Sequence, residues 1–130
     1  MIEEGKYKDL TGAIIGCAME VHNQLGCGFQ ERIYQRALEI EMRNAGIEFA
    51  REFEMQIFYK GTHVGTRRVD FLAEQKICIE LKAVTLLEDV HLAQALNYLE
   101  VYNLEVGLLI NFGTKRMGFK RLVNPKFKVL

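Results

Sequence analysis

The stretch RRVDFLAEQKICIELKAV, residues 67–84, consists of two runs rich in apolar residues separated by the polar triplet Glu74-Gln75-Lys76. Apolar and polar residues alternate along the second run, which predicts a β-strand, and the triplet predicts the turn of an antiparallel hairpin. If the turn is centred on Gln75, Asp70 lies directly opposite Glu80 and on the same face of the sheet. The hairpin therefore predicts two carboxylates as cross-strand neighbours.

Two carboxylates that face each other repel, so this pair needs an explanation. A divalent cation such as Mg²⁺ supplies one, because it binds carboxylate oxygens and keeps water in its remaining coordination positions. Lys82 follows Glu80 on the same face, about 6–7 Å along the strand, where it can orient an attacking water and offset charge on a phosphate. The alternative is a surface hairpin with alternating charges, and a shift of register by one residue would separate Asp70 from Glu80.

The segments before the hairpin have helical and then alternating patterns. Apolar residues at helical spacing predict helices over residues 8–25 and 29–44. The second helix is expected to turn one apolar face to the core, made of Phe29, Ile33, Ala37 and Ile40 with Tyr34 and Leu38 beside them. Period-two alternation predicts a strand over 53–59, and a turn at 60–62 leads into a strand over 63–73. With the strand at 77–84, these residues form a three-stranded antiparallel meander.

After the meander the pattern changes twice more. Residues 88–102 return to helical spacing, and VGLLINF, residues 106–112, is a continuous apolar run typical of a strand covered on both faces. A last short strand is expected over 119–123. The chain is therefore expected to form a single domain over residues 1–130, with an α/β fold whose mixed sheet is flanked by helices.

Composition narrows the class of protein. The chain has 49% apolar and 26% charged residues with one proline, which is typical of a folded globular domain. No apolar run is long enough to span a membrane, and the polar start MIEEGKYKDL does not resemble a signal peptide, so a soluble cytoplasmic protein is expected. Three cysteines without a CxxC pair indicate neither a disulfide framework nor a zinc site and are expected to be small buried residues.

Charge is uneven although the formal net charge is zero. The segment 115–130 has six basic residues and no acidic one. Such a cluster is what a docking surface for nucleic acid would show, because Lys and Arg make most phosphate contacts. A solvated basic tail is the alternative.

Four short motifs carry a resemblance to a known family. RVDF at Arg68–Phe71 and IELK at Ile79–Lys82 resemble the core of the PD-(D/E)xK nuclease superfamily. With GFQERIY at residues 28–34 and GLLINFG at 107–113, the chain resembles the GxxExxY protein family within that superfamily, from about Leu10 to Asn124. Val69 stands where the superfamily motif has its proline.

The resemblance implies a restriction-endonuclease-like αβββαβ core and hydrolysis of phosphodiester bonds with Mg²⁺ or Mn²⁺. It implies that Glu31, Asp70 and Glu80 are metal ligands and that Lys82 is the catalytic lysine. QALNY, residues 94–98, resembles the QxxxY element of RecB-like nucleases, which adds Gln94 and Tyr98 as catalytic-site residues on one helix face.

Three further residues are expected near these positions. His91 shares a helix face with Gln94, although a surface or packing role is the stronger expectation for it. Gly28 is expected to allow close approach of a neighbouring backbone, and Tyr34 to hold Glu31 in position. No Rossmann glycine motif, Walker sequence, GxSxG or HExxH is present, so nucleotide binding by these loops and hydrolysis by these other centres are not expected.

Two hypotheses of different classes remain. The first is a metal-dependent nuclease acting on DNA or RNA. The second is a binding module with a nuclease-like fold that recognises nucleic acid or a protein partner without turnover, as a monomer or a homodimer. Convergence of the carboxyl groups of Glu31, Asp70 and Glu80 would favour the first.

Overall fold

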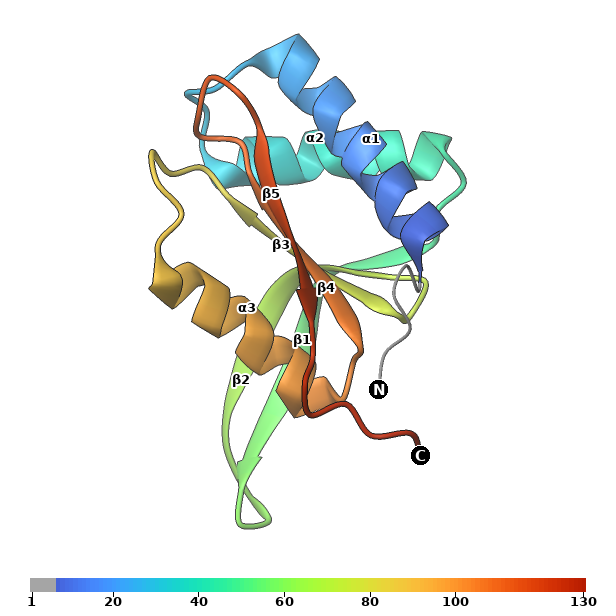
Figure 1. Ribbon diagram of the computed structural model, residues 1–130, viewed down its shortest axis with the longest axis vertical. Coiled ribbons are helices and arrows are strands. Elements are labelled where there is room, and N and C mark those ends of the chain that lie inside the picture. The colour runs from blue at the N-terminus through green and yellow to red at the C-terminus, as the bar shows by residue number, and fades with distance from the viewer. Residues whose placement is uncertain (1–6) are drawn as a thin grey trace.

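The computed structural model describes residues 7–130, so the prediction of a polar N-terminus that is no signal peptide falls largely outside the described residues. The elements follow one another as three helices and five strands (Figure 1). In chain order they are α1 (Lys8–Leu25), α2 (Glu31–Asn44), β1 (Phe49–Tyr59), β2 (Thr62–Ala73), β3 (Ile77–Lys82), α3 (Asp89–Tyr102), β4 (Val106–Asn111) and β5 (Gly118–Val123). This order confirms the predicted αβββαβ core and adds a helix before it and a strand after it.

The five strands form one sheet in the order β1-β2-β3-β4-β5. Neighbours are antiparallel except β3 and β4, which are parallel because α3 carries the chain back across the sheet between them. All six residues of β4 are buried, which confirms the prediction that this strand is covered on both faces. The mixed α/β sheet expected from the sequence is therefore confirmed.

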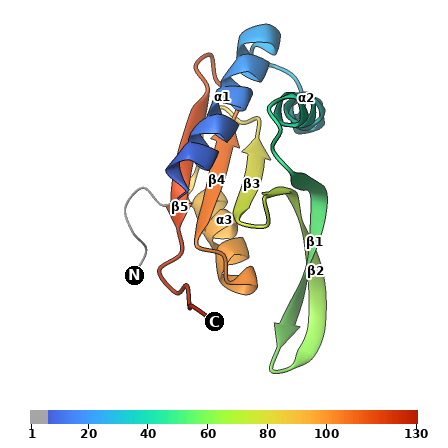
Figure 2. The same cartoon turned by 90° about the vertical axis from the view of Figure 1, so that its right-hand side faces the viewer.

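Helices cover both faces of the sheet (Figure 2). On one face, α1 and α2 pack on a large apolar cluster that includes Ile79, Leu81 and Phe71. On the other face, α3 packs on a smaller cluster of Met55, Val69, Cys78, Tyr98 and Leu99. Among the described residues, no helix is long and apolar enough to cross a membrane.

The apolar face predicted for α2 is correct at Tyr34 and Leu38 and wrong at Phe29, Ile33 and Ile40. The helix buries Tyr34, Leu38 and Met42, whereas Phe29, Ile33 and Ile40 are about half exposed at 48%, 46% and 56%. Both sets recur at helical spacing, and the set next to α1 and the sheet is the one that contains the bulky Tyr34, which stacks on Phe112 with ring centroids 4.5 Å apart.

The loop before α2 is held by Tyr34 and shaped by glycine. The Tyr34 hydroxyl donates to the carbonyl of Gly26 at 2.6 Å and accepts from the backbone N–H of Phe29 at 3.2 Å. Gly28 has φ +115°, a conformation that other residues rarely adopt, and nothing lies within 4 Å of where its Cβ would be. The predicted close approach at Gly28 is therefore wrong, and its backbone angle is the reason for glycine there.

The expectation of three buried cysteines is correct for two of them. Cys17 and Cys78 are buried, each on a different face of the sheet. Cys27 is exposed, because it lies in the loop between α1 and α2 rather than on a packed element.

Candidate active site

The predicted neighbours Asp70 and Glu80 do meet, at the point where β2 and β3 separate. The strands pair through Ala73 with Ile77, Leu72 with Cys78 and Phe71 with Ile79, which is the register expected from the sequence. At the next position, hydrogen bonds from backbone N–H groups to side-chain carboxylates replace the backbone-to-backbone hydrogen bonds. The backbone N–H of Asp70 donates to Glu80 Oε1 at 3.1 Å, and the backbone N–H of Leu81 donates to Asp70 Oδ2 at 2.8 Å.

Both carboxyl groups are in a poorly solvated place. Glu80 is only 8% exposed, and burial, with the nearby Asp70 charge, raises its pKa to about 8. Burial also raises the pKa of Asp70 above its ordinary value. The charges of Lys82 and Arg67 lower the pKa of Glu80, but by less than burial raises it.

Gln35 on α2 is a site residue that the sequence predictions missed. Its Nε2 donates to Asp70 Oδ1 at 2.8 Å, so both oxygens of the Asp70 carboxyl group are fixed by hydrogen bonds from different elements. Gln35 is 6% exposed, and its Oε1 is buried without a hydrogen-bond partner. One signal could have found it: Gln35 follows Glu31 by four residues and so shares its helix face.

Glu31 lies close to the pair without completing a metal site. It is the first residue of α2 and is exposed, and its charge contributes to the raised pKa of Asp70. Within residues 7–130, however, no three His, Cys, Asp or Glu side chains are grouped so that they could hold a metal ion together. The structure thus brings Asp70 and Glu80 together and leaves the three-carboxylate set a prediction.

Lys82 and Arg67 supply the positive charge near the pair. Lys82 ends β3, and its charge lowers the pKa of both Asp70 and Glu80. Arg67 approaches from β2, where its guanidinium donates to the Tyr98 hydroxyl at 2.6 Å and stacks over the ring at 5.4 Å from the centroid. Tyr98 is therefore joined to the site through Arg67.

The other two residues predicted on α3 differ from Tyr98. Gln94 is exposed one turn before Tyr98. His91 caps the start of α3, where its Nδ1 accepts from the backbone N–H of Glu88 at 3.0 Å. A structural role for His91, the stronger of the two expectations, is thus the one observed.

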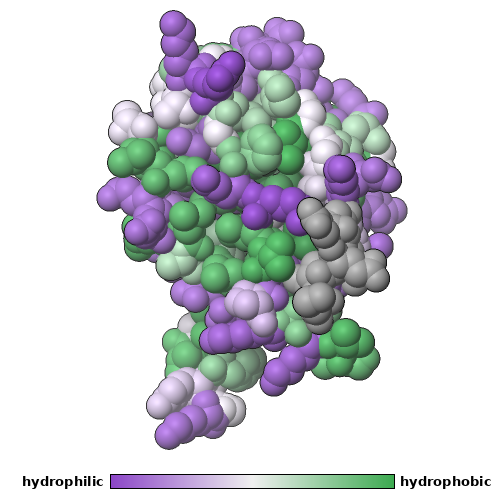
Figure 3. Space-filling model, viewed as in Figure 1, coloured by the Kyte–Doolittle hydropathy of each residue, from purple (hydrophilic) through white to green (hydrophobic). Residues whose placement is uncertain are grey.

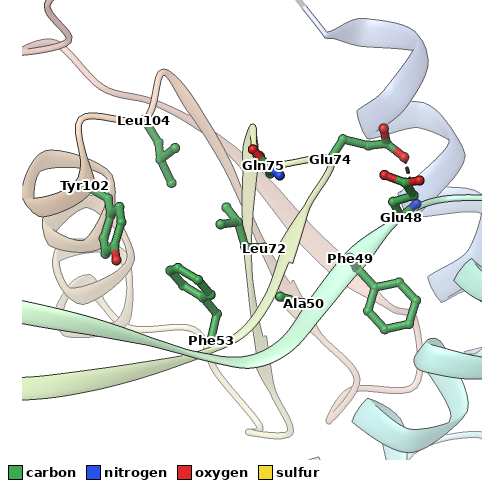
Figure 4. A pocket seen from close by; sticks show the side chains of 9 residues that line it. All are labelled: Glu48, Phe49, Ala50, Phe53, Leu72, Glu74, Gln75, Tyr102 and Leu104. Carbon is green, nitrogen blue, oxygen red and sulfur yellow. Dashed lines mark hydrogen bonds between the residues drawn. The ribbon is translucent and has the colours of Figure 1, made fainter.

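A cavity elsewhere on the surface has a different character. It has a volume of about 620 Å³ and lies between the start of β1, the β2–β3 turn and the end of α3 (Figure 4). Phe53, Leu72, Tyr102 and Leu104 give it apolar walls, and none of the candidate catalytic residues lines it. The cavity is therefore separate from the carboxyl pair.

Comparison with known proteins agrees with the observed fold. The family model of the PD-(D/E)XK nuclease superfamily matches residues 8–122, nearly the whole chain. The chain belongs to the PD-(D/E)XK nuclease superfamily. Nucleases of this superfamily typically use divalent metal ions.

Two further comparisons were with curated proteins and with solved structures. No curated protein matches it. Among solved structures, it is similar to one described as the crystal structure of SSO0001, with a TM-score of 0.60 and 23% identity over 72% of this chain. The match covers 50% of that other chain, so this chain corresponds to about half of its length. At this identity the likeness concerns the fold.

Proposed function

We propose that this protein is a nuclease that hydrolyses phosphodiester bonds in DNA or RNA, with Mg²⁺ or Mn²⁺ held by Asp70 and Glu80. The observation that carries the proposal is the buried carboxyl pair at the divergence of β2 and β3, with Lys82 beside it. Burying two acidic side chains at adjacent positions of neighbouring strands destabilises a sheet, because both charges lose water and repel each other.

The side chains at this place fit a hard divalent cation. Mg²⁺ is commonly held by one or two protein carboxylates and completes its coordination with water and phosphate oxygens. Burial disfavours the charged forms of Asp70 and Glu80, and a cation between them would offset that cost. The unpartnered Gln35 Oε1 is a further oxygen that could accept a hydrogen bond from water at the site. Glu31 would be a third ligand of the cation, or its negative charge would attract the cation to the site.

The protein groups have distinct tasks in this proposal. The cation, when bound, would polarise a phosphate oxygen and lower the pKa of a water molecule. Leu81 N–H and Gln35 Nε2 hold the Asp70 carboxyl group in one orientation, so little reorganisation is needed on binding. Lys82 stabilises the negative charge that develops on the phosphate.

We assign the chain to the GxxExxY type of protein within the superfamily. The two residues of its QxxxY element, Gln94 and Tyr98, are proposed to have different roles. Tyr98 holds the guanidinium of Arg67 near Glu80 and is a positioning residue. Gln94 is exposed one helical turn earlier and is proposed to contact the backbone of the substrate.

The test combines cation binding with cleavage. Titration calorimetry with Mn²⁺ and Mg²⁺ measures binding without nucleic acid, and cleavage is measured on single-stranded, duplex and branched DNA and on RNA. We expect Lys82→Ala and Asp70→Asn to lower cleavage by about 10²–10³-fold or more. Lys76→Ala, which alters an exposed lysine in the β2–β3 turn, is the matched control and should cleave like wild type.

The outcomes separate the two classes of function. Cation binding together with cleavage that depends on Lys82 supports the nuclease. Nucleic-acid binding without any cation-dependent cut would instead support the binding module predicted as the rival. The predicted homodimer is tested in the same preparations by light scattering, which gives the mass in solution.

A further inference from the structure

The hairpin of β1 and β2 extends well beyond the rest of the domain. Both views show its turn projecting past α3 and the ends of β4 and β5 (Figures 1 and 2). The two strands pair along nearly their whole length, from Phe49 with Ala73 to Tyr59 with Thr62. β1 is also one of the two edge strands of the sheet. We call residues 54–68 the arm.

The outer part of the arm exposes large apolar side chains. Phe58, Tyr59 and Val64 are 62%, 64% and 60% exposed. In the space-filling view the arm is a narrow lobe at the lower end of the molecule, where hydrophobic and hydrophilic surface lie side by side (Figure 3). Phe58 packs edge-to-face on His63 across the hairpin, with ring centroids 5.6 Å apart, and still leaves most of its surface exposed to a partner.

Positive charge accompanies the aromatic rings. The arm has three basic residues, Lys60, Arg67 and Arg68, and one acidic residue, Glu54, in a chain whose formal net charge is zero. Glu54 is bound to Arg68 at 3.1 Å. The ammonium of Lys60 lies 5.5 Å from the centre of the Tyr59 ring, so a cation and an exposed ring occur together at the tip. Rings that stack on bases beside cations that bind phosphates are typical of surfaces for single-stranded nucleic acid.

β2 leads directly from the arm to the candidate active site. Thr62 and Asp70 lie on the same strand, about 26 Å apart at the usual rise per residue. Arg67 lies between them on β2, and its guanidinium donates a hydrogen bond to the Tyr98 hydroxyl close to Glu80. A stacked strand rises about 3.4 Å per nucleotide, so this distance corresponds to roughly eight nucleotides.

We propose that the arm binds single-stranded nucleic acid through Phe58 and Tyr59, and that it holds the substrate about eight nucleotides from the bond that is cut. The proposal rests on the nuclease function and names its substrate class: a nucleic acid with a single-stranded segment beside the cleavage site. A regular duplex offers its bases only at the edges, so it cannot stack on these rings.

Binding is tested without cleavage, by fluorescence anisotropy in EDTA with single strands of about 4 to 16 nucleotides and with a duplex of about 16 base pairs. The arm variant is Phe58→Ser with Tyr59→Ser, and the matched control is Met19→Ser with Ile40→Ser, which also replaces two exposed apolar residues. All four positions are exposed, so melting temperatures should stay close to wild type.

We expect the arm variant to bind the longest single strand about tenfold more weakly or worse, and the control to bind it like wild type. Wild-type affinity should rise as strands lengthen past about eight nucleotides, and the arm variant should lose most of that rise. Equal affinity of arm variant and wild type would overturn the proposal. So would a preference for the duplex, or a fall in mass by light scattering in the arm variant with unchanged affinity, because the arm would then bind a second copy.

These outcomes are distinct from those of the nuclease test. Cation-dependent cleavage that the arm variant retains in full, with unchanged affinity, rejects the arm and keeps the nuclease. Arm-dependent binding of single strands without any cut in Mn²⁺ or Mg²⁺ rejects the nuclease and keeps nucleic-acid recognition by the arm.

Discussion

The two faces of the sheet differ in what they bury, and β3 shows the difference within six residues. Ile77, Ile79 and Leu81 point to the α1 and α2 side and belong to the large apolar cluster. Cys78 points to the α3 side, and Glu80 and Lys82 follow it there because side chains alternate along a strand. One face therefore supplies most of the apolar packing, and the other holds charged groups in place.

This division has a physical consequence for the candidate site. The unfavourable burial of Glu80 is offset by apolar packing on the opposite face of β3, whereas the Asp70 carboxyl group is held by Gln35 of α2. Replacing a residue of the site should therefore lower stability less than truncating a residue of the large cluster.

The largest expected effect on stability is at Ile79. Ile79 is fully buried in the large cluster, so Ile79→Ala leaves a cavity and should lower the free energy of unfolding by about 3 kcal/mol. Cys78→Ala, the neighbouring position on the other face, removes a single heavy atom and should cost about 1 kcal/mol. Urea unfolding measures both, and equal losses would show that the two faces contribute alike.

Glu80→Gln should change how stability depends on pH. Because burial raises the pKa of Glu80 from 4.5 to about 8, the folded state binds more protons than the unfolded state between these values. Wild type without metal should therefore lose stability as pH rises through this window, by ~2–4 kcal/mol, and Asp70 adds in the same direction. Glu80→Gln cannot ionise, so it should remove most of the slope and be more stable than wild type near pH 8.

Urea unfolding in EDTA from about pH 5 to about pH 9 measures the slope. Glu54→Gln, at an exposed carboxyl group on β1, is the control and should keep the wild-type slope. Added Mn²⁺ at the alkaline end should stabilise wild type more than Glu80→Gln. A wild-type curve that rises with pH would contradict the assignment of a buried, proton-binding Glu80.

The sequence predicts the hairpin register well, and physical reasons explain why. A period of two and a short polar turn leave few ways to pair β2 with β3, so the meeting of Asp70 and Glu80 follows. The buried face of α2 was not predictable in the same way. Two apolar stripes are present, at Tyr34 and Leu38 and at Ile33 and Ile40, and only the packing of α1 and the sheet selects between them.

Gln35 was missed for a related reason. A polar residue within a helix is normally expected at the surface, and the only local signal for Gln35 is its spacing of four residues from Glu31. The contact depends on residues 35 positions apart in the chain, which only the assembled fold brings together. The same holds for Glu31, whose approach to Asp70 was implied by family resemblance and not by local pattern.

Gln35→Leu should weaken cation binding with little effect on stability. The change keeps the volume of the side chain, removes the hydrogen bond to Asp70 Oδ1 and removes the buried Oε1 that has no partner. Loss of such an orienting contact typically lowers metal affinity by about 10–100-fold. Calorimetry with Mn²⁺ measures the affinity, and Gln24→Leu, at an exposed glutamine of α1, should bind like wild type. A merely structural Gln35 would change the melting temperature and leave the affinity unchanged.

The smallest effect is expected at Gly28, in the loop between α1 and α2. Its φ of +115° disfavours any side chain, so Gly28→Ala should cost about 1–2 kcal/mol of stability. Gly12→Ala, at an exposed position within α1 with nothing near its Cβ, should instead stabilise the protein by about 0.5–1 kcal/mol. Because Asp70 and Glu80 are held by β2 and β3 and not by this loop, Mn²⁺ affinity should change less than about threefold in both variants. A loss of Mn²⁺ affinity in Gly28→Ala alone would mean that the loop positions Glu31 as a ligand. The cation would then be held by three carboxylates, those of Glu31, Asp70 and Glu80.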